Sequence, residues 1–232
     1  MEPPGKREGL DMRVETVSYP RFTLQMIDSP SAESVMPAES GRYYRVELPS
    51  APDNCAEMQK KGYIFADRTL GVGISLKRTE LDFRKLIRFE IRPEDPNNEA
   101  ILEIALSSFP SDRRFHVRPK PDEEVSGEVI RRWVKELTEV YVCVHKGEIV
   151  GFLDLEPYGE KDCFIHLAAV RERYRAAGAA VSLYAHAVLT AKEKGCEKLC
   201  GRISSTNTAV VNLYARLGAT FGEPRDVFVR SE

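Results

Sequence analysis

The stretch LAAVRERYRAAGAA, residues 167–180, decides the fold class and carries the main chemical signal of this chain. Its first four residues end an apolar strand, three arginines follow, and a run of small residues then opens a long helix. The first N–H groups of a helix have no intrahelical acceptor, and the helix dipole places partial positive charge there. Because small side chains permit close approach, the stretch predicts a main-chain anion site. The alternative is a solvated arginine loop followed by alanines that pack a helix on the sheet.

Regular patterns on both sides of this stretch predict an α/β protein of the α+β type. Charged and apolar residues alternate over 84–92, as in a strand with one wet face, and residues 145–148 read as a hairpin turn. Helices are expected over 97–109, 126–137, 178–194 and 207–217, and strands over 84–92, 139–144, 149–155, 163–170 and 197–204, with a last strand pair over 219–230 around Pro224. We therefore expect a mixed, mostly antiparallel sheet flanked by helices.

The N-terminal part has weaker signals. Prolines are scattered through the first forty residues, which we expect to be rich in loops. A short helix around Cys55 and Met58 should end at Gly62, and strands are expected over 63–65 and 73–76. The sequence thus predicts a small N-terminal α/β unit over residues 1–80, with a role in substrate binding or dimerisation, and the main domain over residues 81–232.

Composition excludes several classes of protein. The chain has 232 residues, of which 42% are hydrophobic and 30% charged, as in globular proteins rather than disordered, fibrous or membrane chains. A net charge of −2 gives no extended basic field for nucleic acid. Residues 1–10 have no apolar core of a signal peptide, and no apolar run is long enough to span a bilayer. We expect a cytoplasmic protein with neither a nucleic-acid nor a membrane partner.

The cysteines give no sign of a metal or disulfide framework. Their number is five, an odd number, and none form a CxxC pair. Reduced thiols that fill the core are therefore expected, and no metal site.

The run from Arg175 to Ala180, RAAGAA, resembles the Gln/Arg-x-x-Gly-x-Gly/Ala signature of the GNAT superfamily of acyl-CoA-dependent N-acyltransferases. In that family the signature also follows a strand and begins a long helix. The resemblance implies that main-chain N–H groups hold the pyrophosphate of coenzyme A, and that the preceding strand end pairs with the pantetheine arm. The cofactor-binding residues expected from it, with Arg173 from the arginine run, are Ala168, Ala169, Val170, Arg173, Arg175, Ala176, Ala177, Gly178, Ala179 and Ala180.

A second stretch, NTAVVNLYARLG over 207–218, resembles a later motif of the same family. Seven residues are about two helical turns, so Asn207 and Tyr214 lie on one helix side. Taken alone, Asn207 is a good N-cap, and Tyr214 is a residue that buries its ring. The resemblance implies that Asn207 contacts acetyl-CoA, the cosubstrate, and that Tyr214 protonates the departing thiolate. It also implies that the N–H of Val170 polarises the thioester carbonyl.

The general base is less directly indicated. Some family members carry a Glu early on the strand where this chain has Phe164. By strand alternation His166 shares a face with Phe164, Ala168 and Val170, and imidazole is the side chain best suited to exchange protons near neutral pH. His166 is therefore a candidate to take a proton from an ammonium substrate. The alternative is a buried structural histidine.

The acceptor depends on the rest of the chain. Within the superfamily, the layout resembles the TDP-fucosamine acetyltransferase group, in the segment 62–70, the Arg-Phe-His element at 114–116, the helix with Trp133, and the block 204–218. This implies a nucleotide-linked amino sugar, whose diphosphate would meet Arg113, Arg114, Arg118 and Lys120, unless these form a solvated loop.

Other acceptors and a different role stay open. A peptide N-terminus, a lysine or a small amine would also suit the family, as would a non-enzymatic acyl-CoA-binding module. A homodimer is expected by analogy alone.

Overall fold

A computed structural model describes residues 12–37, 39, 42–109, 113 and 122–230 of the chain. The strands are β1 (Arg13–Ser18), β2 (Thr23–Asp28), β3 (Tyr43–Pro49), β4 (Tyr63–Ser75), β5 (Glu90–Glu94), β6 (Val140–His145), β7 (Glu148–Tyr158), β8 (Asp162–Val170), β9 (Lys198–Ser204) and β10 (Thr220–Arg230). The helices are α1 (Pro52–Lys60), the 3-10 helix η1 (Phe83–Leu86), α2 (Glu99–Ser108), α3 (Glu123–Lys135), α4 (Glu172–Arg175), α5 (Ala179–Glu193) and α6 (Thr208–Arg216). None of the described helices is both long and apolar enough to cross a membrane.

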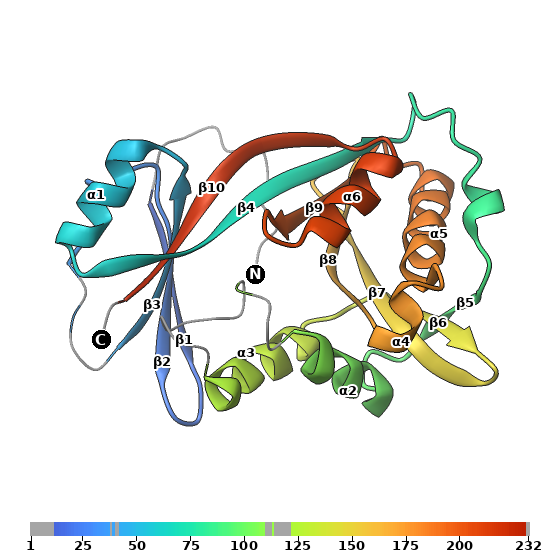
Figure 1. The fold of residues 1–232 in the computed structure, drawn as a ribbon, viewed down its shortest axis with the longest axis horizontal. Coiled ribbons are helices and arrows are strands. Elements are labelled where there is room, and N and C mark those ends of the chain that lie inside the picture. The colour runs from blue at the N-terminus through green and yellow to red at the C-terminus, as the bar shows by residue number, and fades with distance from the viewer. Residues whose placement is uncertain (1–11, 38, 40–41, 110–112, 114–121, 231–232) are drawn as a thin grey trace.

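All the strands join one ten-stranded sheet in the order β1-β2-β3-β10-β4-β9-β8-β7-β6-β5. The pairs β2–β3 and β8–β9 are parallel, and the other pairs are antiparallel. The long strands β4 and β10 run side by side and connect the two ends of the molecule (Figure 1). The predicted fold class, a mixed and mostly antiparallel sheet flanked by helices, is confirmed.

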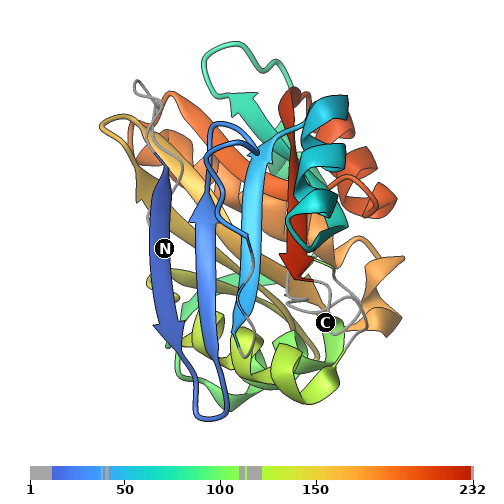
Figure 2. The same ribbon diagram turned by 90° about the vertical axis from the view of Figure 1, so that its left-hand side faces the viewer.

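Helices cover both faces of the sheet. α5 packs on one face with the largest apolar cluster, in which Leu183 and Val188 are buried. α2 and α3 cover the other face, and their apolar cluster includes Val17 and Leu24 of the N-terminal strands. α1 packs through Met58 on β3, β4 and β10, beside the three N-terminal strands that Figure 2 shows next to one another. The core is thus divided into three clusters by the curved sheet.

The N-terminal part is more regular than expected. The first forty residues include the β1–β2 hairpin, so the expectation of a loop-rich stretch there was wrong for residues 13–28. Pro20 lies in the connection between the two strands, where a missing N–H costs no ladder hydrogen bond. The two strands expected over 63–65 and 73–76 are one continuous strand, β4, which pairs with both β9 and β10. The division of the chain at residue 80 stays a prediction.

Two other expectations are corrected. The strand predicted over 84–92 is a 3-10 turn followed by β5, because Phe83 is buried in the α5-side cluster and the Arg88 N–H donates to Ser182 of α5. The strand pair predicted over 219–230 is a single strand, β10. An irregularity between Phe221 and Pro224 takes up the proline, so the strand continues.

A buried ion cluster ties the N-terminal strands to the middle of the sheet. Glu47 on β3 has a side chain only 16% exposed, and its carboxylate lies 3.3 Å from Arg45, 3.3 Å from Arg202 on β9 and 3.4 Å from Arg225 on β10. Burial alone would raise the pKa of Glu47, but the three guanidinium groups outweigh it and lower the pKa. The cluster therefore joins β3, β9 and β10 across strands that are far apart in sequence.

The first prediction concerns this cluster. Glu47→Gln leaves three largely buried guanidinium groups without their shared carboxylate, so the free energy of unfolding should fall by about 3 kcal/mol. Urea denaturation checks it. Glu57→Gln, which removes only partly exposed ion pairs on α1, is the control and should change stability by less than about 1 kcal/mol. Equal effects of the two changes would contradict the role assigned to Glu47.

Candidate active site

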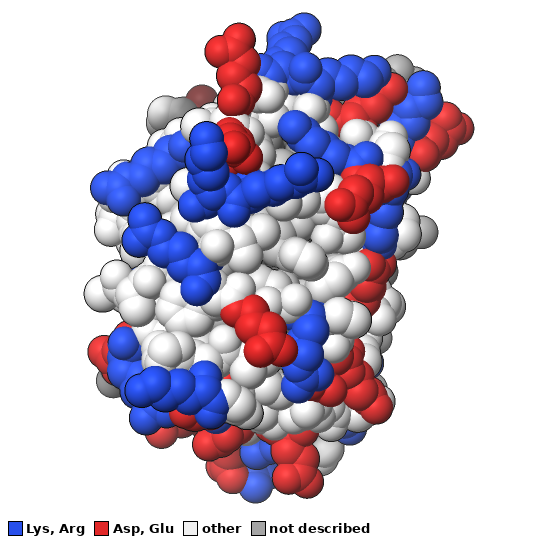
Figure 3. Space-filling view, turned by 90° about the vertical axis from the view of Figure 1, so that its right-hand side faces the viewer, with Lys and Arg blue, Asp and Glu red and all other residues white. Residues whose placement is uncertain are grey.

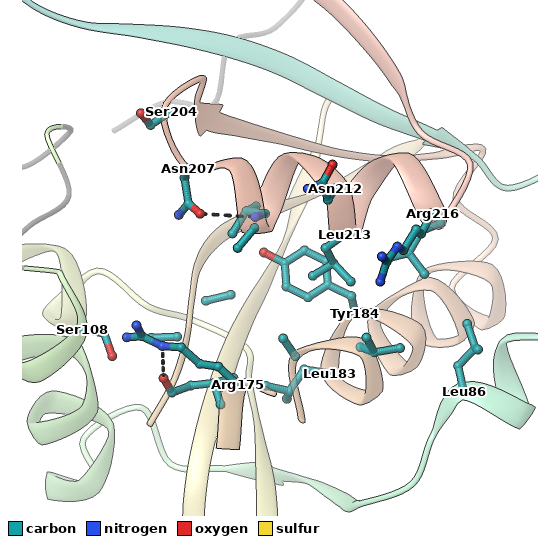
Figure 4. A pocket seen from close by; sticks show the side chains of 18 of the residues that line it. Leu86, Ser108, Arg175, Leu183, Tyr184, Ser204, Asn207, Asn212, Leu213 and Arg216 are labelled. Carbon is teal, nitrogen blue, oxygen red and sulfur yellow. Dashed lines mark hydrogen bonds between the residues drawn. The ribbon is translucent and has the colours of Figure 1, made fainter. Parts of the chain in front are cut away.

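The site begins where the parallel strands β8 and β9 separate. They pair from Asp162 with Lys198 to Ile165 with Gly201, and no pairs follow, although β8 runs on to Val170 and β9 to Ser204. A cavity of about 890 Å³ lies between β8, the start of α5 and helix α6 (Figure 4). Separated strands leave backbone groups unpaired on the facing edges, which an extended ligand can use.

Six of the residues expected to bind a cofactor line this cavity. They come from β8, α4, the start of α5 and the N-cap of α6, and they are Ala168, Ala169, Val170, Arg175, Ala180 and Asn207. Their convergence joins the two sequence motifs at one site. The remaining expected residues, Arg173, Ala176, Ala177, Gly178 and Ala179, are not among its lining residues.

The edge of β8 faces the cavity at Val170. The next N–H, that of Arg171, donates to the carbonyl of Val150 on β7. Because successive backbone groups of a strand point to opposite edges, the N–H and C=O of Val170 point away from β7, to the edge that β9 has left. Consistent with this, Arg175 Nε donates to the Val170 carbonyl at 3.1 Å (Figure 4). A donor therefore sits on the open edge at Val170.

The start of α5 has the conformation that the glycine requires. Gly178 is the residue before the helix, with φ of +89°, and nothing lies within 4 Å of the position that a Cβ would take. A side chain there is therefore disfavoured by backbone strain rather than by lack of space. Arg173 points elsewhere, because its guanidinium pairs with Glu148 at the β6–β7 turn.

Asn207 and Tyr214 hold different places around α6. The Asn207 side chain caps the helix by accepting the Val210 N–H, at the rim of the cavity (Figure 4). Tyr214 is 1% exposed and does not line the cavity; a Cβ on Gly201 would lie 2.6 Å from its hydroxyl. Gly201 is the last residue of β9 that pairs with β8. The Tyr214 hydroxyl thus lies directly beside the point where the strands separate.

Sequence reasoning missed several polar residues of the cavity, among them Tyr184 and Arg216. Tyr184 lies on α5 outside both motifs, yet its side chain projects from α5 toward α6 inside the cavity and packs edge-on against Tyr214 (Figure 4). Arg216 was unremarkable as a basic residue in the last turn of a helix, and it also lines the cavity. Only the packing of α5 against α6 could have identified them, because Tyr184 lies outside both motifs and Arg216, although inside the stretch 207–218, has no role implied by the resemblance.

A bulge in β8 corrects the placement of His166. Leu153 pairs with Ala168 and Leu155 with Ile165, so β8 has one more residue than β7 between these pairs. The extra residue reverses the alternation. We expected His166 to share a face with Ala168 and Val170, and the bulge shows that this expectation was wrong. Those two residues pack on the α5 side, whereas the imidazole contacts Trp133 of α3 with ring centroids 5.1 Å apart.

Three acidic or basic side chains meet at this bulge. Glu156 Oε1 lies 3.6 Å from His166 Nδ1, and the Asp154 carboxylate interacts electrostatically with both residues. One oxygen of Asp154 accepts the N–H groups of Thr138 and Glu139. Its other oxygen, Glu156 Oε1 and His166 Nε2 are buried without a hydrogen-bond partner among the described residues. Burial raises the pKa of Asp154 to about 6.

Charged side chains of both signs lie on the surface of the molecule. Basic and acidic side chains are interspersed on the face shown in Figure 3, with uncharged surface between them. Of the residues proposed to meet a diphosphate, Arg113 reaches the Ala66 carbonyl, and Arg114, Arg118 and Lys120 lie outside the described residues, as does His116. In the described part of the chain, no group of three or more His, Cys, Asp or Glu side chains is arranged to hold a metal ion.

Asp154 supplies the second prediction. Its pKa is higher in the folded chain than in the unfolded one, so the folded state binds an extra proton and stability falls as the pH rises from about 4 to 6. Asp154→Asn should remove this fall and stabilise the chain at pH 7.5 by about 2 kcal/mol, because the amide oxygen still accepts the two backbone N–H groups.

Urea denaturation between pH 4 and 8 measures this effect. The exposed change Glu160→Gln is the control and should keep the wild-type dependence. An unchanged pH dependence in Asp154→Asn would show that Asp154 titrates normally.

Comparison with known proteins shows the family of the chain. The sequence profile described as "Acetyltransferase (GNAT) family" matches residues 98–219, more than half of the chain. None of the curated protein sequences compared with the chain matches it.

Solved structures with a similar fold cover nearly the whole chain. A functionally unknown conserved protein from Staphylococcus epidermidis has a TM-score of 0.61 at 12% identity, covering 97% of this chain and 96% of its own. A GCN5-related N-acetyltransferase from Sphaerobacter thermophilus has a TM-score of 0.59 at 15% identity, covering 94% and 76%. A GCN5-related N-acetyltransferase-like protein from Streptococcus suis has a TM-score of 0.56 at 17% identity, covering 94% and 84%. At these identities the likeness concerns the fold.

Proposed function

Because the chain belongs to the GNAT family of acetyltransferases, we propose that it moves an acetyl group from acetyl-CoA to a primary amine by direct attack of the amine on the thioester. The observation that carries this proposal is the separation of β8 and β9 after Ile165 and Gly201, with the cavity that it opens. The separation brings a free strand edge, a helix start and two candidate proton-transfer groups to one place.

Residues of the cavity suit the parts of acetyl-CoA. The open edge at Val170 offers an N–H to the thioester carbonyl, and the preceding residues suit the extended pantetheine arm. The N–H groups at the start of α5 suit the pyrophosphate, with Arg175 and Arg216 on the cavity wall as counter-charges. Asn207 lies at the rim of the cavity, where its amide can contact the pantetheine arm.

Two residues at the separation point are proposed to move protons. The acceptor nitrogen attacks the thioester carbon and the C–S bond breaks; the nitrogen loses a proton to His166, and the thiolate gains one from Tyr214. Tyr214 reaches this point beside Gly201, from the α6 side, and His166 lies next to Ile165 on the opposite face. Acid and base thus stand on opposite sides of the reacting group.

For the acceptor we propose an amino sugar carried on a nucleotide. The proposal rests on the resemblance of residues 62–70, 114–116 and 204–218 to the TDP-fucosamine acetyltransferase group. Peptide N-termini, lysine side chains and small amines are the competing acceptors. A nucleotide-linked amino sugar that stabilises the protein against heat, where peptides do not, would separate them.

The third prediction tests the cofactor site. Acetyl-CoA at one hundred times its dissociation constant should stabilise the wild-type chain by about 2.7 kcal/mol. Gly178→Glu should lose this gain, because it puts a negative charge at the helix start. Thermal unfolding with and without acetyl-CoA measures both.

A control separates strain from charge. Gly195 lies just beyond the other end of α5, also with positive φ and open space at the Cβ position, so Gly195→Glu imposes the same strain away from the cavity. It should keep the acetyl-CoA effect. Loss in both variants, or in neither, would contradict the assignment of the phosphate site.

The fourth prediction concerns the proton donor. Tyr214→Phe should lower kcat by about a hundredfold and leave the stabilisation by acetyl-CoA unchanged, because only the hydroxyl is removed. Steady-state kinetics alongside thermal unfolding checks this. Tyr184→Phe should change kcat much less. The reverse order of the two effects would assign the donor role to Tyr184, the phenol that lines the cavity.

A further inference from the structure

Two carboxylates near the separation point lack the arginine partners that two other buried acids, Glu47 and Asp226, have. Glu47 is surrounded by three arginines, and the buried Asp226 pairs with Arg68. Asp154 is fully buried, yet among the described residues no Lys or Arg forms an ion pair with it or with Glu156. Buried charges are normally paired, so this exception calls for a cationic partner.

The unsatisfied atoms belong to three neighbouring side chains. Asp154 Oδ2, Glu156 Oε1 and His166 Nε2 are all buried without a hydrogen-bond partner in the described chain. The side chain of His166 is 8% exposed and that of Glu156 is 18% exposed, so the spot is enclosed but not sealed. The ring of Trp133 forms one side of it, in contact with the imidazole. Two carboxylates and an indole ring form an environment that favours an organic cation.

This spot lies one step from the proposed point of acetyl transfer. His166 directly follows Ile165, the last residue of β8 that pairs with β9. The bulge turns His166 to the face opposite the cavity, whereas Ala168 faces α5. An amine held at the carboxylates would therefore meet the thioester through the gap between the two strands, without competing with coenzyme A for the cavity.

We propose that Asp154, Glu156 and the ring of Trp133 form a subsite for the ammonium group of the acceptor, which selects amines that have no carboxylate on the neighbouring carbon. This rests on the proposed function and names its substrate class. The ammonium replaces the missing hydrogen-bond partners of both carboxylates. A carboxylate beside the amine would instead meet two negative charges at low solvent exposure, so α-amino acids are excluded and amino sugars or simple amines are accepted.

The subsite also defines the proton path. The bound ammonium gives one proton to His166 Nε2, which releases it to solvent, and the neutral amine attacks. The attacking nitrogen then loses its second proton to His166, the departing thiolate takes the proton of Tyr214, and His166 and Tyr214 return to their starting states by proton exchange with solvent. Glu156 lies at ion-pair distance from Nδ1 and stabilises the imidazolium. Asp154 and Glu156 are in this scheme groups that bind and position, and His166 is the group that takes the proton.

The chain contains a single tryptophan, so its fluorescence reports on this subsite. We would titrate the full chain, with coenzyme A present, with D-glucosamine, D-glucosaminic acid and N-acetylglucosamine. The second ligand places a carboxylate beside the amine, and the third is neutral. We expect a saturable change in fluorescence with glucosamine, and a dissociation constant at least tenfold lower for glucosamine than for either other ligand. No saturable response to glucosamine, methylamine or tyramine would overturn the proposal, as would equal affinity for the acid.

Variants separate this proposal from the function on which it rests. Glu156→Gln should weaken glucosamine binding, raise its KM at least tenfold and reduce the discrimination against glucosaminic acid. Its kcat should fall by a smaller factor, because Glu156 also stabilises the imidazolium of His166. Glu160→Gln on the exposed β7–β8 turn is the matched control and should behave as wild type. Asp154→Asn, which retains its backbone hydrogen bonds, should act in the same direction if Glu156→Gln folds poorly. A lower kcat with unchanged KM and discrimination would overturn the subsite.

Acetyl-CoA binding distinguishes the two failures. If acetyl-CoA stabilises the chain while no amine changes the tryptophan fluorescence, the proposed subsite is wrong and the cofactor site is retained. If acetyl-CoA gives no stabilisation, the proposed function fails first.

Discussion

The separation of two parallel strands is the constraint on which the site depends. β8 and β9 pair over four residues and then part, so the edge at Val170 lies against a cavity instead of a neighbouring strand. Buried backbone groups left without partners are costly, so such an edge persists only when the elements around it hold it open. Here α5 lines one side of the cavity and α6 lines the other. A bulge at the same level turns His166 to the opposite face, which separates acid from base by the thickness of the sheet.

Strands far from the cavity hold the gap open. β9 is paired along its length with β4, which continues as a thirteen-residue strand into the N-terminal part. Glu47 on β3 also forms an ion pair with Arg202 of β9. β8 is held in the same way by β7. Each edge of the gap is thus braced by a strand on its outer side, and the N-terminal strands contribute to the site without lining the cavity.

Local signals in the sequence located most elements and half of the site. Gly178, Gly195 and Gly218 all have positive φ where helices were expected to begin or end, and Asn207 caps its helix. The convergence of the two motifs at one cavity followed from their resemblance to a family. The sequence could not show the effect of one inserted residue, the bulge that turns the His166 side chain to the other face of the sheet. Nor could it show effects of packing between distant elements. These are the burial of Phe83, which replaces a strand by a turn, and the position of Tyr184 in the cavity.

The position of β10 has a consequence for how the chain reaches its native state. β10 is the last strand in sequence, yet it lies between β3 and β4, so Val46 pairs with Phe228 across most of the chain. Until residues 220–230 leave the ribosome, the first three strands have no place in the sheet, and the edges of β3 and β4 stay exposed. Such non-local pairing slows folding and leaves strand edges open to self-association. The sheet is therefore completed only after β10 has been synthesised, and the chain that still lacks β10 is the form most open to self-association through its strand edges.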